Sequence, residues 1–481
     1  MDKISRRSML RMGAIAAGGI LAGCAPQVVK ETVVVEKEVE KVVKETVVVE
    51  QEVEKQVTVE VDRAAERAAT LQANIVWDTF RGVGTGWNEE RISTFKDIYP
   101  NVNIEFRPMV LASQQEAYGK MFAMAAAGDL GDLIAFDPSH FHFWRAVNKN
   151  VIMPMDDLVE ADGLDLTQWF EQFIEMQRYK GKFYGLPSWG WSGQDSLGIN
   201  TKHFDEMGIP APAVDDYSVS MDTIGEWART FYQAGEGPGQ VGRYGIQPVY
   251  SDQGLSVLTC AFGGQLINAE GTQCELATNE KSRAALKWLY DLCVVDKVAS
   301  IPGDFQNATA AWADGKVTMY QGGSLSLINL KKAITDAELA ELSVVFFPKR
   351  ADGMIPSQLR GGCWNINAAS KYPEATYEFM KHIAGKEGTV GFNLVGGNGA
   401  LTRPDVLPIL AARDEVYQWF QTNLTNGMPI HPPANSRGRE YTDACTQWLG
   451  KMMDRNNPIP FEQGLQELHD NVQKVLDLPE P

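Results

Sequence analysis

The run Asn74-Ile75-Val76-Trp77 opens the stretch of sequence, residues 74–136, that decides the fold of this chain. Two further short apolar runs follow it, Val102-Asn103-Ile104-Glu105-Phe106 and Asp132 to Phe136. The middle run alternates apolar and polar side chains, as a half-buried strand does, and the other two have the length of buried strands. Three strands are therefore predicted within this stretch.

Helical patterns separate these runs. Ile92, Phe95 and Ile98 keep helical spacing until Tyr99-Pro100, and residues 118–127 form a second helical stretch. The resulting β-α-β-α-β order predicts an α/β sheet with helices on its faces. Toward the C-terminus, further helices are expected over residues 282–294, 372–383, 416–423, 441–453 and 461–476.

Composition separates a globular part from an unusual N-terminal part. From about Leu71 aromatic residues appear, and roughly 410 residues remain, which is enough for two packed domains. The 481 residues carry 44 Lys and Arg against 62 Asp and Glu, a net charge of −18. This acidic balance argues against nucleic acid as a partner, and no later apolar run has the length of a membrane-spanning helix.

The first 24 residues have the features of an export signal. Arg6 and Arg7 resemble a twin-arginine signal, and residues 14–22 form a Gly/Ala-rich run that is too short to span a bilayer. Leu21-Ala22-Gly23-Cys24 resembles a bacterial lipoprotein cleavage box. The alternative, a buried N-terminal helix, is disfavoured because the run is rich in glycine. We therefore expect residues 1–24 to end at a lipidated Cys24 that anchors the protein outside the cell membrane.

A repeat follows Cys24 and predicts a stalk over residues 25–70. Residues 28–41 read VVKETVVVEKEVEK, and residues 42–55 repeat them with Gln51 in place of Lys37. The period of two heptads fits a marginal coiled coil, whereas the β-branched residues favour an extended stalk. Both alternatives hold a globular domain away from the membrane.

Five cysteines follow Cys24, and their number is odd. None shows C-x-x-C spacing, so no zinc ribbon or redox pair is predicted. Buried free thiols are expected, with a disulfide between Cys260 and Cys274 as the alternative. The five are Cys260, Cys274, Cys293, Cys363 and Cys445.

Residues 179–187 carry a resemblance to a known family. They read Tyr179-Lys180-Gly181-Lys182-Phe183-Tyr184-Gly185-Leu186-Pro187 and resemble the GK-x-YGLP hairpin of family 1 extracellular solute-binding proteins. These proteins are the sugar-capturing subunits of ABC importers and include the maltose-binding protein. Further motifs in family order lie at residues 95–106, 127–136, 197–210, 263–266, 311–319 and 368–371. The chain departs from the family pattern at Gly131, at Ile199 and in an insertion at residues 213–221.

The resemblance implies an α/β fold of the two-lobe, periplasmic-binding-protein-like type II clamshell, with the ligand in the cleft. The chain would cross between the lobes three times, near Gln194, Leu342 and Gly397. Lobe 1 would then comprise residues 71–193 and 343–397, and lobe 2 would comprise residues 194–342 and 398–481.

A carbohydrate site needs flat aromatic side chains and polar groups, because a sugar presents C–H faces and a rim of hydroxyls. Trp189 and Trp191, among 12 tryptophans, are flanked by glycines at the first crossing, where they form either a ligand platform or hinge packing. Most other candidates lie at or near predicted strand ends, where open α/β sheets bind ligands. They are Trp77, Asp78, Arg81, Phe136, Asp137, Ser324 and Trp364. The resemblance implies two more candidates, Gln247 and Tyr250, which lie where the maltose-binding relatives carry an acidic residue and a tyrosine that contact the sugar, and Arg403 after the last predicted crossing is a further candidate. The alternatives are an N-cap for Asp137, a turn for Ser324 and core packing for Trp364.

Three sequence patterns suggest zinc binding, nucleotide binding or glycoside hydrolysis, but a structural role is favoured for each. His140-Phe141-His142 lacks a nearby third ligand for zinc. The G-x-G-x-x-G match at residues 237–242 contains proline and follows a predicted helix, which argues against nucleotide binding. Asp129, Asp132 and Asp137 are not paired at the spacing of glycosidase carboxylates. No catalytic residue, metal site or cofactor is therefore predicted.

Two functional hypotheses follow. The first is a monomeric, lipid-anchored binding subunit of an ABC importer that delivers a carbohydrate to the permease, without chemistry of its own. The alternative is a surface-anchored carbohydrate-active enzyme, either a glycoside hydrolase or a lyase. A sensor that uses the same closing motion is not distinguished from the first hypothesis.

Overall fold

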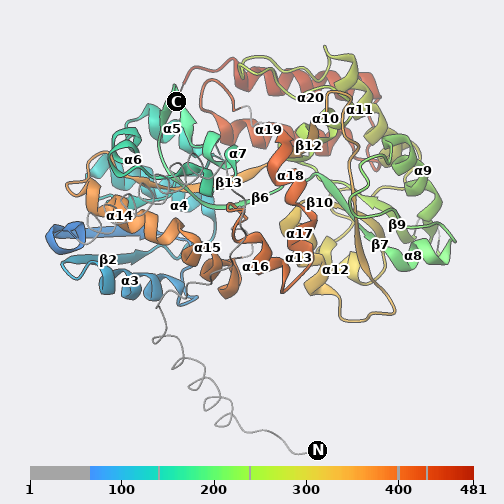
Figure 1. Cartoon of the computed structure of the whole chain (residues 1–481). Helices are drawn as coiled ribbons and strands as arrows, with labels where there is room; N and C mark the ends of the chain where they lie inside the picture. Colours follow the sequence, from blue (N-terminus) through green and yellow to red (C-terminus); the bar gives the residue numbers. More distant parts are fainter. Residues whose placement is uncertain (1–65, 139–140, 238–239, 398–400, 429–431, 481) are drawn as a thin grey trace, which may run out of the picture. The chain divides into compact units, whose positions relative to one another are not determined.

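The computed structural model of the chain describes residues 66–138, 141–237, 240–397, 401–428 and 432–480. The predicted signal, Cys24 and the repeats lie outside the described residues, and residues 66–70 of the predicted stalk are helical. The chain divides into the units Met1–Arg67 and Ala68–Pro481. The second unit contains two five-stranded sheets with helices packed on them, which confirms the predicted α/β class (Figure 1).

The first sheet has the strand order β2-β1-β3-β13-β6. Its strands are β2 (Val102–Pro108), β1 (Ala73–Thr79), β3 (Leu133–Ile134), β13 (Arg360–Ile366) and β6 (Leu186–Trp191). β1 is parallel to β2 and β3, and α3 (Trp87–Ile98) and α4 (Gln114–Ala127) connect them as the β-α-β-α-β pattern predicts. β3 is shorter than predicted because the Phe136 amide donates to the side-chain oxygen of Asn365, at 2.8 Å, rather than to a neighbouring backbone.

Helices from distant parts of the chain cover the first sheet. α14 (Pro373–Ala384) and α15 (Lys386–Phe392) pack beside α3, while α5 (His142–Asn148), α6 (Asp156–Asp162) and α7 (Glu171–Glu175) follow β3 in the chain. One hydrophobic core of this lobe contains Trp77, Trp87, Phe95, Trp364 and Phe379. Within the family-like stretch, β4 (Arg178–Tyr179) and β5 (Lys182–Phe183) form a hairpin. Lys180 and Gly181 both have positive φ, as a type I′ turn requires.

The second sheet has the order β11-β7-β10-β9-β8. Its strands are β11 (Leu342–Phe346), β7 (Ser196–Asn200), β10 (Val317–Gly322), β9 (Val241–Gln247) and β8 (Gln233–Ala234). The helical elements between them are α8 (Thr201–Glu206), α9 (Met221–Phe231), α10 (Asp252–Ala261), α11 (Glu280–Tyr290), η3 (Asp291–Val295), α12 (Ala308–Ala313) and α13 (Ser324–Ala333).

β11 corrects one predicted boundary. Leu342–Phe346 pairs along its whole length with Ser196–Asn200 of β7, so it belongs to the second sheet. The chain therefore leaves this sheet after Phe346 rather than near Leu342, because Val344, Val345 and Phe346 are buried there. β12 (Ile355–Gln358) then leads to β13 of the first sheet.

The C-terminal helices pack mainly with the second sheet's helices. α19 (Gly438–Met452) and α20 (Phe461–Leu476) pack on each other and on α10 and α11, and α20 has the predicted bounds. The predicted helix over residues 416–423 is instead two helices, α17 (Val416–Trp419) and α18 (Gln421–Asn426), because the chain turns at the buried Phe420. The remaining elements are η2 (Leu166–Gln168), η4 (Asn393–Gly397), α16 (Leu407–Ala411) and β14 (Gly427–Met428).

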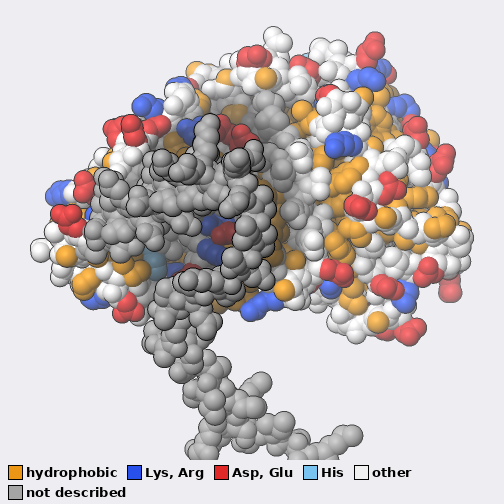
Figure 2. Space-filling view, viewed as in Figure 1, with side chains coloured by type: hydrophobic (Ala, Val, Ile, Leu, Met, Phe, Trp, Pro, Cys, Tyr) orange, Lys and Arg blue, Asp and Glu red, His pale blue; other side chains and the backbone are white. Residues whose placement is uncertain are grey.

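All five cysteines of the globular part are free and buried. Their burial matches the expected free thiols, and the alternative Cys260–Cys274 disulfide is not formed. Among the described helices, none combines the length and apolar character that crossing a membrane requires. On the face shown in Figure 2, acidic and basic side chains are interspersed outside the grey atoms.

We expect Trp77→Ala to lower the free energy of unfolding by about 3–5 kcal/mol, because it leaves a cavity in the core of the first lobe. Chemical denaturation monitored by circular dichroism measures the loss. Trp419→Ala, at a half-exposed ring of α17, is the matched control and should cost much less. Equal losses for the two variants would contradict the assignment of Trp77 to the core.

Candidate functional site

The ends of strands from both sheets meet at the segment that joins β6 to β7. Arg81 and Asp137 follow β1 and β3 of the first sheet, and Trp191 ends β6. From the second sheet, Gln321 of β10 donates through Nε2 to the Gln194 carbonyl oxygen at 3.1 Å. The Ser324 amide, at the start of α13, donates to the Ser192 carbonyl oxygen at 3.3 Å. Residues 192–195 thus bring the binding edges of the two sheets together.

Trp189 and Trp191 form a stacked aromatic pair. Their ring centroids are 4.3 Å apart with an interplanar angle of 28°. Residues two apart in a strand point to the same face, which explains why these rings meet. Gly190 between them faces the other way, where a Cβ atom would lie 2.3 Å from the Phe173 ring. Trp189 is only 7% exposed and Trp191 is half-exposed, so the pair offers a partly open aromatic surface.

A buried ion pair supports this aromatic pair. Arg81 donates through Nη2 to Asp137 Oδ1, and the Tyr118 hydroxyl donates to Asp137 Oδ2. The Arg81 guanidinium carbon also lies 4.5 Å from the centroid of the Trp189 ring, within cation–π range. Burial raises the pKa of Asp137, while Arg81 and Tyr118 oppose that rise. The arrangement fixes the cation beneath the aromatic surface.

Gly362 of β13 is required for this convergence. A Cβ atom there would lie 2.0 Å from Asp137 Oδ1, 2.1 Å from Trp189 Nε1 and 2.4 Å from Arg81 Nη2. Distances this short are clashes, so only glycine allows the three side chains to meet against the strand. The Gly361-Gly362 pair is therefore a sequence signal for the site.

A cavity of about 310 Å³ opens beside Arg81 and Trp189. Leu325 of α13 contributes to its wall from the second lobe. Its volume lies at the small end of the range for ligand pockets. The lining residues are Phe80, Arg81, Gly82, Val83, Thr85, Gln114, Trp189, Leu325, Phe392 and Val395.

A second charge pair joins elements of the two lobes and was not among the predicted site residues. Arg360 Nη2 of β13 donates to Asp252 Oδ2 of α10 at 3.0 Å. A cavity of about 200 Å³ adjoins this pair and includes Phe141, Gln358 and Tyr441 in its wall. Asp252 and Arg360 lie 108 positions apart in sequence, so no local pattern connects them.

Three predicted aromatic ligand contacts lie in the core instead. Trp77 is 0% exposed and packs against Trp364 at 5.6 Å and Phe379 at 5.1 Å between centroids, while Trp364 is 1% exposed. Phe136 is also fully buried, 4.8 Å from the Phe122 ring of α4. The predictions for Trp77, Trp364 and Phe136 are corrected on this basis, because their rings are enclosed by other side chains of the first lobe.

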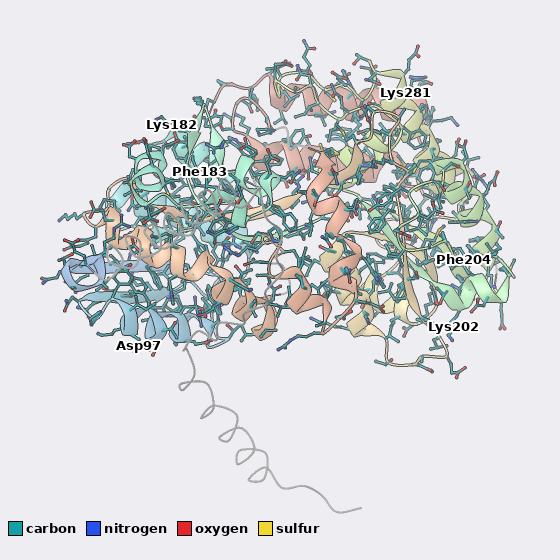
Figure 3. All side chains as sticks on the ribbon, in the orientation of Figure 1. Asp97, Lys182, Phe183, Lys202, Phe204 and Lys281 are labelled. Atoms are coloured by element: carbon teal, nitrogen blue, oxygen red, sulfur yellow. The ribbon has the colours of Figure 1, made fainter. Side chains whose placement is uncertain are left out.

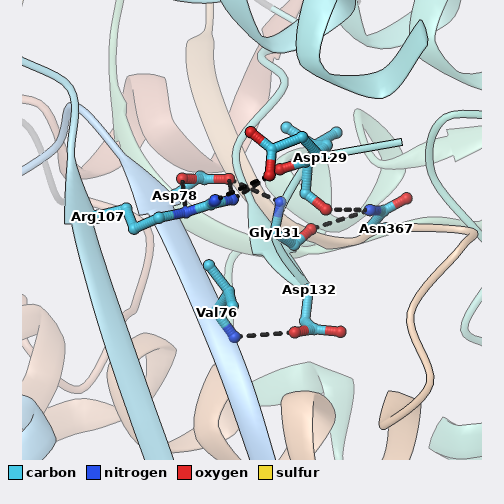
Figure 4. A network of polar contacts seen from close by, with 8 residues as sticks. Val76, Asp78, Arg107, Asp129, Gly131, Asp132 and Asn367 are labelled. Atoms are coloured by element: carbon cyan, nitrogen blue, oxygen red, sulfur yellow. Dashed lines mark hydrogen bonds and ion pairs between the residues drawn. The ribbon is translucent and has the colours of Figure 1, made fainter. Parts of the chain in front are cut away.

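Asp78 connects strands rather than facing the cavity (Figure 4). Its two oxygens accept from Arg107 of β2, from Nε at 2.9 Å and from Nη2 at 2.6 Å. The amide of Gly131 also donates to Asp78 Oδ2 at 2.6 Å. Asp78 is 1% exposed, and its oxygens are occupied within the first lobe. The predicted ligand contact is therefore corrected to a structural role.

Two candidates from the second lobe, Gln247 and Tyr250, form hydrogen bonds with Ser300. The Tyr250 hydroxyl donates to the Ser300 carbonyl oxygen at 2.6 Å, and Gln247 Oε1 accepts from the Ser300 hydroxyl at 2.5 Å. Both side chains thus contact the interior of that lobe. Ser324 is fully buried against the crossing at Ser192. These hydrogen bonds occupy part of Gln247 and Tyr250, whose contacts with a ligand stay predictions, and Ser324 lies beside the site.

The Arg403 side chain contacts its near neighbour Asp405 and the Trp169 ring of the first lobe. It bonds Asp405, from Nε to Oδ1 at 3.0 Å, and its guanidinium lies 4.7 Å from the Trp169 ring. It therefore packs structurally and is not retained as a candidate.

The structure places the two sequence patterns that suggest zinc or nucleotide binding as follows. His142 Nε2 lies 2.7 Å from Gln115 Oε1, and burial lowers its pKa to about 4, while His140 lies outside the described residues. The glycine-rich match lies in the hairpin connection between β8 and β9, partly outside the described residues. It follows a short strand rather than a helix. In the described part of the chain, no group of three His, Cys, Asp or Glu side chains is placed to hold a metal.

Asp129 and Asp132 bond within the first lobe. Asp129 Oδ1 accepts from Arg107 Nη1 at 3.3 Å, and Asp132 accepts from the Val76 amide at 2.8 Å and from the Ser370 hydroxyl at 2.6 Å. Figure 4 shows the contacts of Asp129 with Arg107 and of Asp132 with Val76. Their carboxylates hold loops against the sheet.

The crossing itself contains a buried carboxyl group, Asp195. It accepts from Asn423 Nδ2 and, at 3.4 Å, from the Ser192 hydroxyl, and it is 1% exposed. Burial raises its pKa to about 6, although these hydrogen bonds oppose the rise. Gln194 before it has φ of +58°, a conformation that L-residues rarely adopt. The joint between the sheets is therefore tightly specified.

Comparisons with known proteins identify the family of the chain and relatives of its fold. Residues 90–407 match the family described as bacterial extracellular solute-binding proteins. No curated protein matches the chain significantly.

Several solved structures share the fold. A substrate-binding protein of an ABC system from Listeria monocytogenes, in complex with cycloalternan, has a TM-score of 0.67 at 17% identity, covering 84% of this chain and 99% of its own. The sugar-binding protein MalE from Xanthomonas citri has a TM-score of 0.69 at 14% identity, with 84% and 97% covered. UgpB from Mycobacterium tuberculosis, in complex with glycerophosphocholine, has a TM-score of 0.68 at 16% identity, with 84% and 98% covered.

The buried Asp195 predicts a pH dependence of stability. Its folded-state pKa of about 6 lies above the usual 3.8, so the folded protein binds this proton more tightly than the unfolded chain. The resulting stabilisation is fully present below about pH 4 and is lost as the pH rises through 6. Relative to Asp195→Asn, the wild type should therefore gain on the order of 3 kcal/mol of unfolding free energy between pH 7 and pH 4.

Urea denaturation of both proteins at the two pH values measures this difference. His142, His203 and His382, whose pKa values burial lowers to about 4, titrate in both proteins and cancel in the comparison. Asp97→Asn, at an exposed position, is the matched control. A wild-type advantage that does not change with pH would rule out the raised pKa.

Proposed function

Because the chain belongs to the family of bacterial extracellular solute-binding proteins, we propose that it is the substrate-binding subunit of an ABC importer for a carbohydrate. In this proposal it captures the sugar between its lobes and delivers it to the transmembrane permease. The family places its action outside the cytoplasm.

The observation that carries the proposal is the stacked pair Trp189–Trp191 beside Arg81. A half-exposed indole offers a flat surface for the C–H face of a sugar ring. Arg81 lines the adjoining cavity and supplies N–H donors suited to hydroxyl oxygens. Proteins of the same fold are known in complex with cycloalternan and with maltotetraose, which supports a carbohydrate as the ligand.

We propose binding without catalysis. A glycosidase needs two carboxyl groups that face the scissile bond, one of them available as an acid. Near the aromatic pair, Asp137 is occupied by Arg81 and Tyr118, and farther away Asp252 is occupied by Arg360. These pairings support a receptor rather than the alternative, a surface-anchored glycoside hydrolase or lyase.

We further propose three crossings between the lobes, which would allow the cleft to close around its ligand. The first is the segment 192–195 between β6 and β7, and the second runs from β11 through β12 to β13. The third would follow η4, next to residues 398–400, which lie outside the described part of the chain. In the same proposal, the protein is a monomer that Cys24 anchors to the membrane through lipid.

Removing the exposed ring of the pair should weaken binding. We expect Trp191→Ala to raise the Kd for the ligand roughly tenfold or more, because stacking and apolar burial contribute on the order of 1–3 kcal/mol. A thermal-shift screen over neutral mono- and oligosaccharides identifies the ligand, and calorimetry then measures Kd. Trp448→Ala, at a half-exposed tryptophan of α19, is the matched control and should leave Kd unchanged.

The same incubations test the enzyme alternative. A receptor returns the oligosaccharide intact, so no new reducing ends should appear after prolonged incubation. Their appearance in proportion to protein concentration would favour the hydrolase. If neither Trp191→Ala nor Trp189→Ala changes Kd, the pair is hinge packing and the ligand lies elsewhere.

Lipid attachment is tested on protein extracted from the native membrane. We expect Cys24 to be the mature N-terminus and to carry acyl chains, because it ends the Leu21-Ala22-Gly23-Cys24 box. Intact-mass analysis measures the modification, and Cys24→Ser should move the protein to the soluble fraction. An unmodified thiol at position 24 would contradict the anchor.

A further inference from the structure

The ion pair Arg360–Asp252 differs from the other buried charge pairs of the site in where its partners come from. Arg360 begins β13 of the first sheet, whereas Asp252 begins α10, which follows β9 of the second sheet. Their side chains are only 1% and 4% exposed. Arg81–Asp137 and Asp78–Arg107, by contrast, lie within the first lobe. The Arg360–Asp252 pair instead joins elements of the two sheets beside the crossing, because Arg360 follows β12 and pairs with Trp191 at the end of β6.

Residues close in sequence to Asp252 and Arg360 help to position both charged side chains. Asp252 is the first residue of α10, where the helix dipole favours a carboxylate, and the Ser251 side chain caps the same turn. Arg360 Nη2 donates to Gln358 Oε1 as well as to Asp252. The start of α10 therefore favours the Asp252 carboxylate, and Gln358 of β12 is a second acceptor for the Arg360 guanidinium.

An aromatic contact between the lobes covers the ion pair. Phe141, at the start of α5, lies 5.4 Å below the Arg360 guanidinium and 5.8 Å from the Tyr441 ring of α19, edge to face. Phe141 has φ of +61°, an unfavourable conformation that the packing around it maintains. α19 approaches closely because Gly438 faces Phe141, where a Cβ atom would lie 1.9 Å from the Phe141 Cβ.

The stability of this contact depends on both charged side chains, because each is solvated by water when the lobes are apart. When the lobes are apart, water solvates both charges, and when they meet, each charge loses that water and is stabilised by the other together with Gln358 and the start of α10. Removing one partner therefore penalises the closed arrangement and leaves the open one nearly unchanged. Other contacts between these elements, such as Asn148 Nδ2 to Ser436 Oγ at 3.0 Å, are nearer the surface and weaker in effect.

We propose that Arg360–Asp252, covered by Phe141 and Tyr441, is a latch that holds the two lobes together in the absence of ligand. The inference rests on the proposed function in one respect, that the lobes open and close. It assigns Arg360 and Asp252 a positioning role: they set the population of the closed form, and the ligand contacts other residues.

The test measures the distance between the lobes in the full chain without ligand. Nitroxide labels are placed at Lys182→Cys of β5 and Lys281→Cys of α11, two exposed positions labelled in Figure 3. Cys24→Ser is included throughout, and the five buried cysteines react poorly because they are enclosed. Dipolar spectroscopy then reports the distribution of distances between the labels.

The wild type should show one dominant, short distance. Asp252→Asn should add a longer distance and change the short-to-long ratio at least tenfold. Glu206→Gln removes a carboxylate from the pair with Arg243, which lies within the second lobe, and should match the wild type. Addition of a sugar found in the screen should restore the short distance in Asp252→Asn.

Either of two results would overturn the latch: a folded Asp252→Asn protein with the wild-type distribution, or a wild type that is mainly open. If Asp252→Asn fails to fold, Phe141→Leu removes the aromatic half of the contact and should shift the ratio in the same direction. Because these distances need no ligand, failure to find a sugar would count against the proposed function alone.

Discussion

The buried ion pair between Arg81 and Asp137 is the constraint on which the rest of the site depends. A charge inside a protein is tolerated only with a well-placed partner, so the ends of β1 and β3 must keep a fixed spacing. The same requirement selects glycine at position 362, where any side chain would displace the pair. The ion pair also fixes the position of Trp189, because the Trp189 ring lies over the Arg81 guanidinium. A polar interaction therefore positions the apolar surface that a ligand would contact.

The consequence for binding is preorganisation. If the proposed sugar site is correct, an indole that already stacks on its neighbour and on a cation would lose little rotational freedom when a sugar ring covers it. Gly190 contributes to the same effect, since it lets Phe173 pack against the back of β6. The aromatic pair is therefore already fixed within its lobe. The loss of conformational freedom on binding would then come mainly from the closing of one lobe against the other. In a receptor that closes, nearly all of the conformational free energy of binding then lies in the equilibrium between the open and closed forms.

How much could be predicted from the sequence depended on whether a feature is local. The sequence pattern placed α20 at its observed bounds, and the β-α-β-α-β pattern predicted three of the five strands of the first sheet. Arg81 and Asp137 were found because they follow strands, and strand ends share one edge of a sheet. Trp77 and Asp78 lie inside β1, where alternation directs one into the core and the other to Arg107, and no pattern in one strand tells which face is covered. The boundary at β11 and the Arg360–Asp252 pair depend on contacts between distant segments, which local patterns do not encode.

Charge burial at three places separates the parts of this protein that stay rigid from the part that moves. Arg81–Asp137 and Asp78–Arg107 are buried within one lobe, so they stabilise its shape in every state. Asp195 is buried in the crossing itself, where its hydrogen bonds to Asn423 and Ser192 define the joint. In the proposed latch, Arg360–Asp252 is the buried pair that forms when the lobes meet. A ligand shifts such an equilibrium only by its difference in affinity for the two forms, so its apparent affinity includes the energy of that last pair. Residues that never touch the ligand can therefore set how tightly it is held.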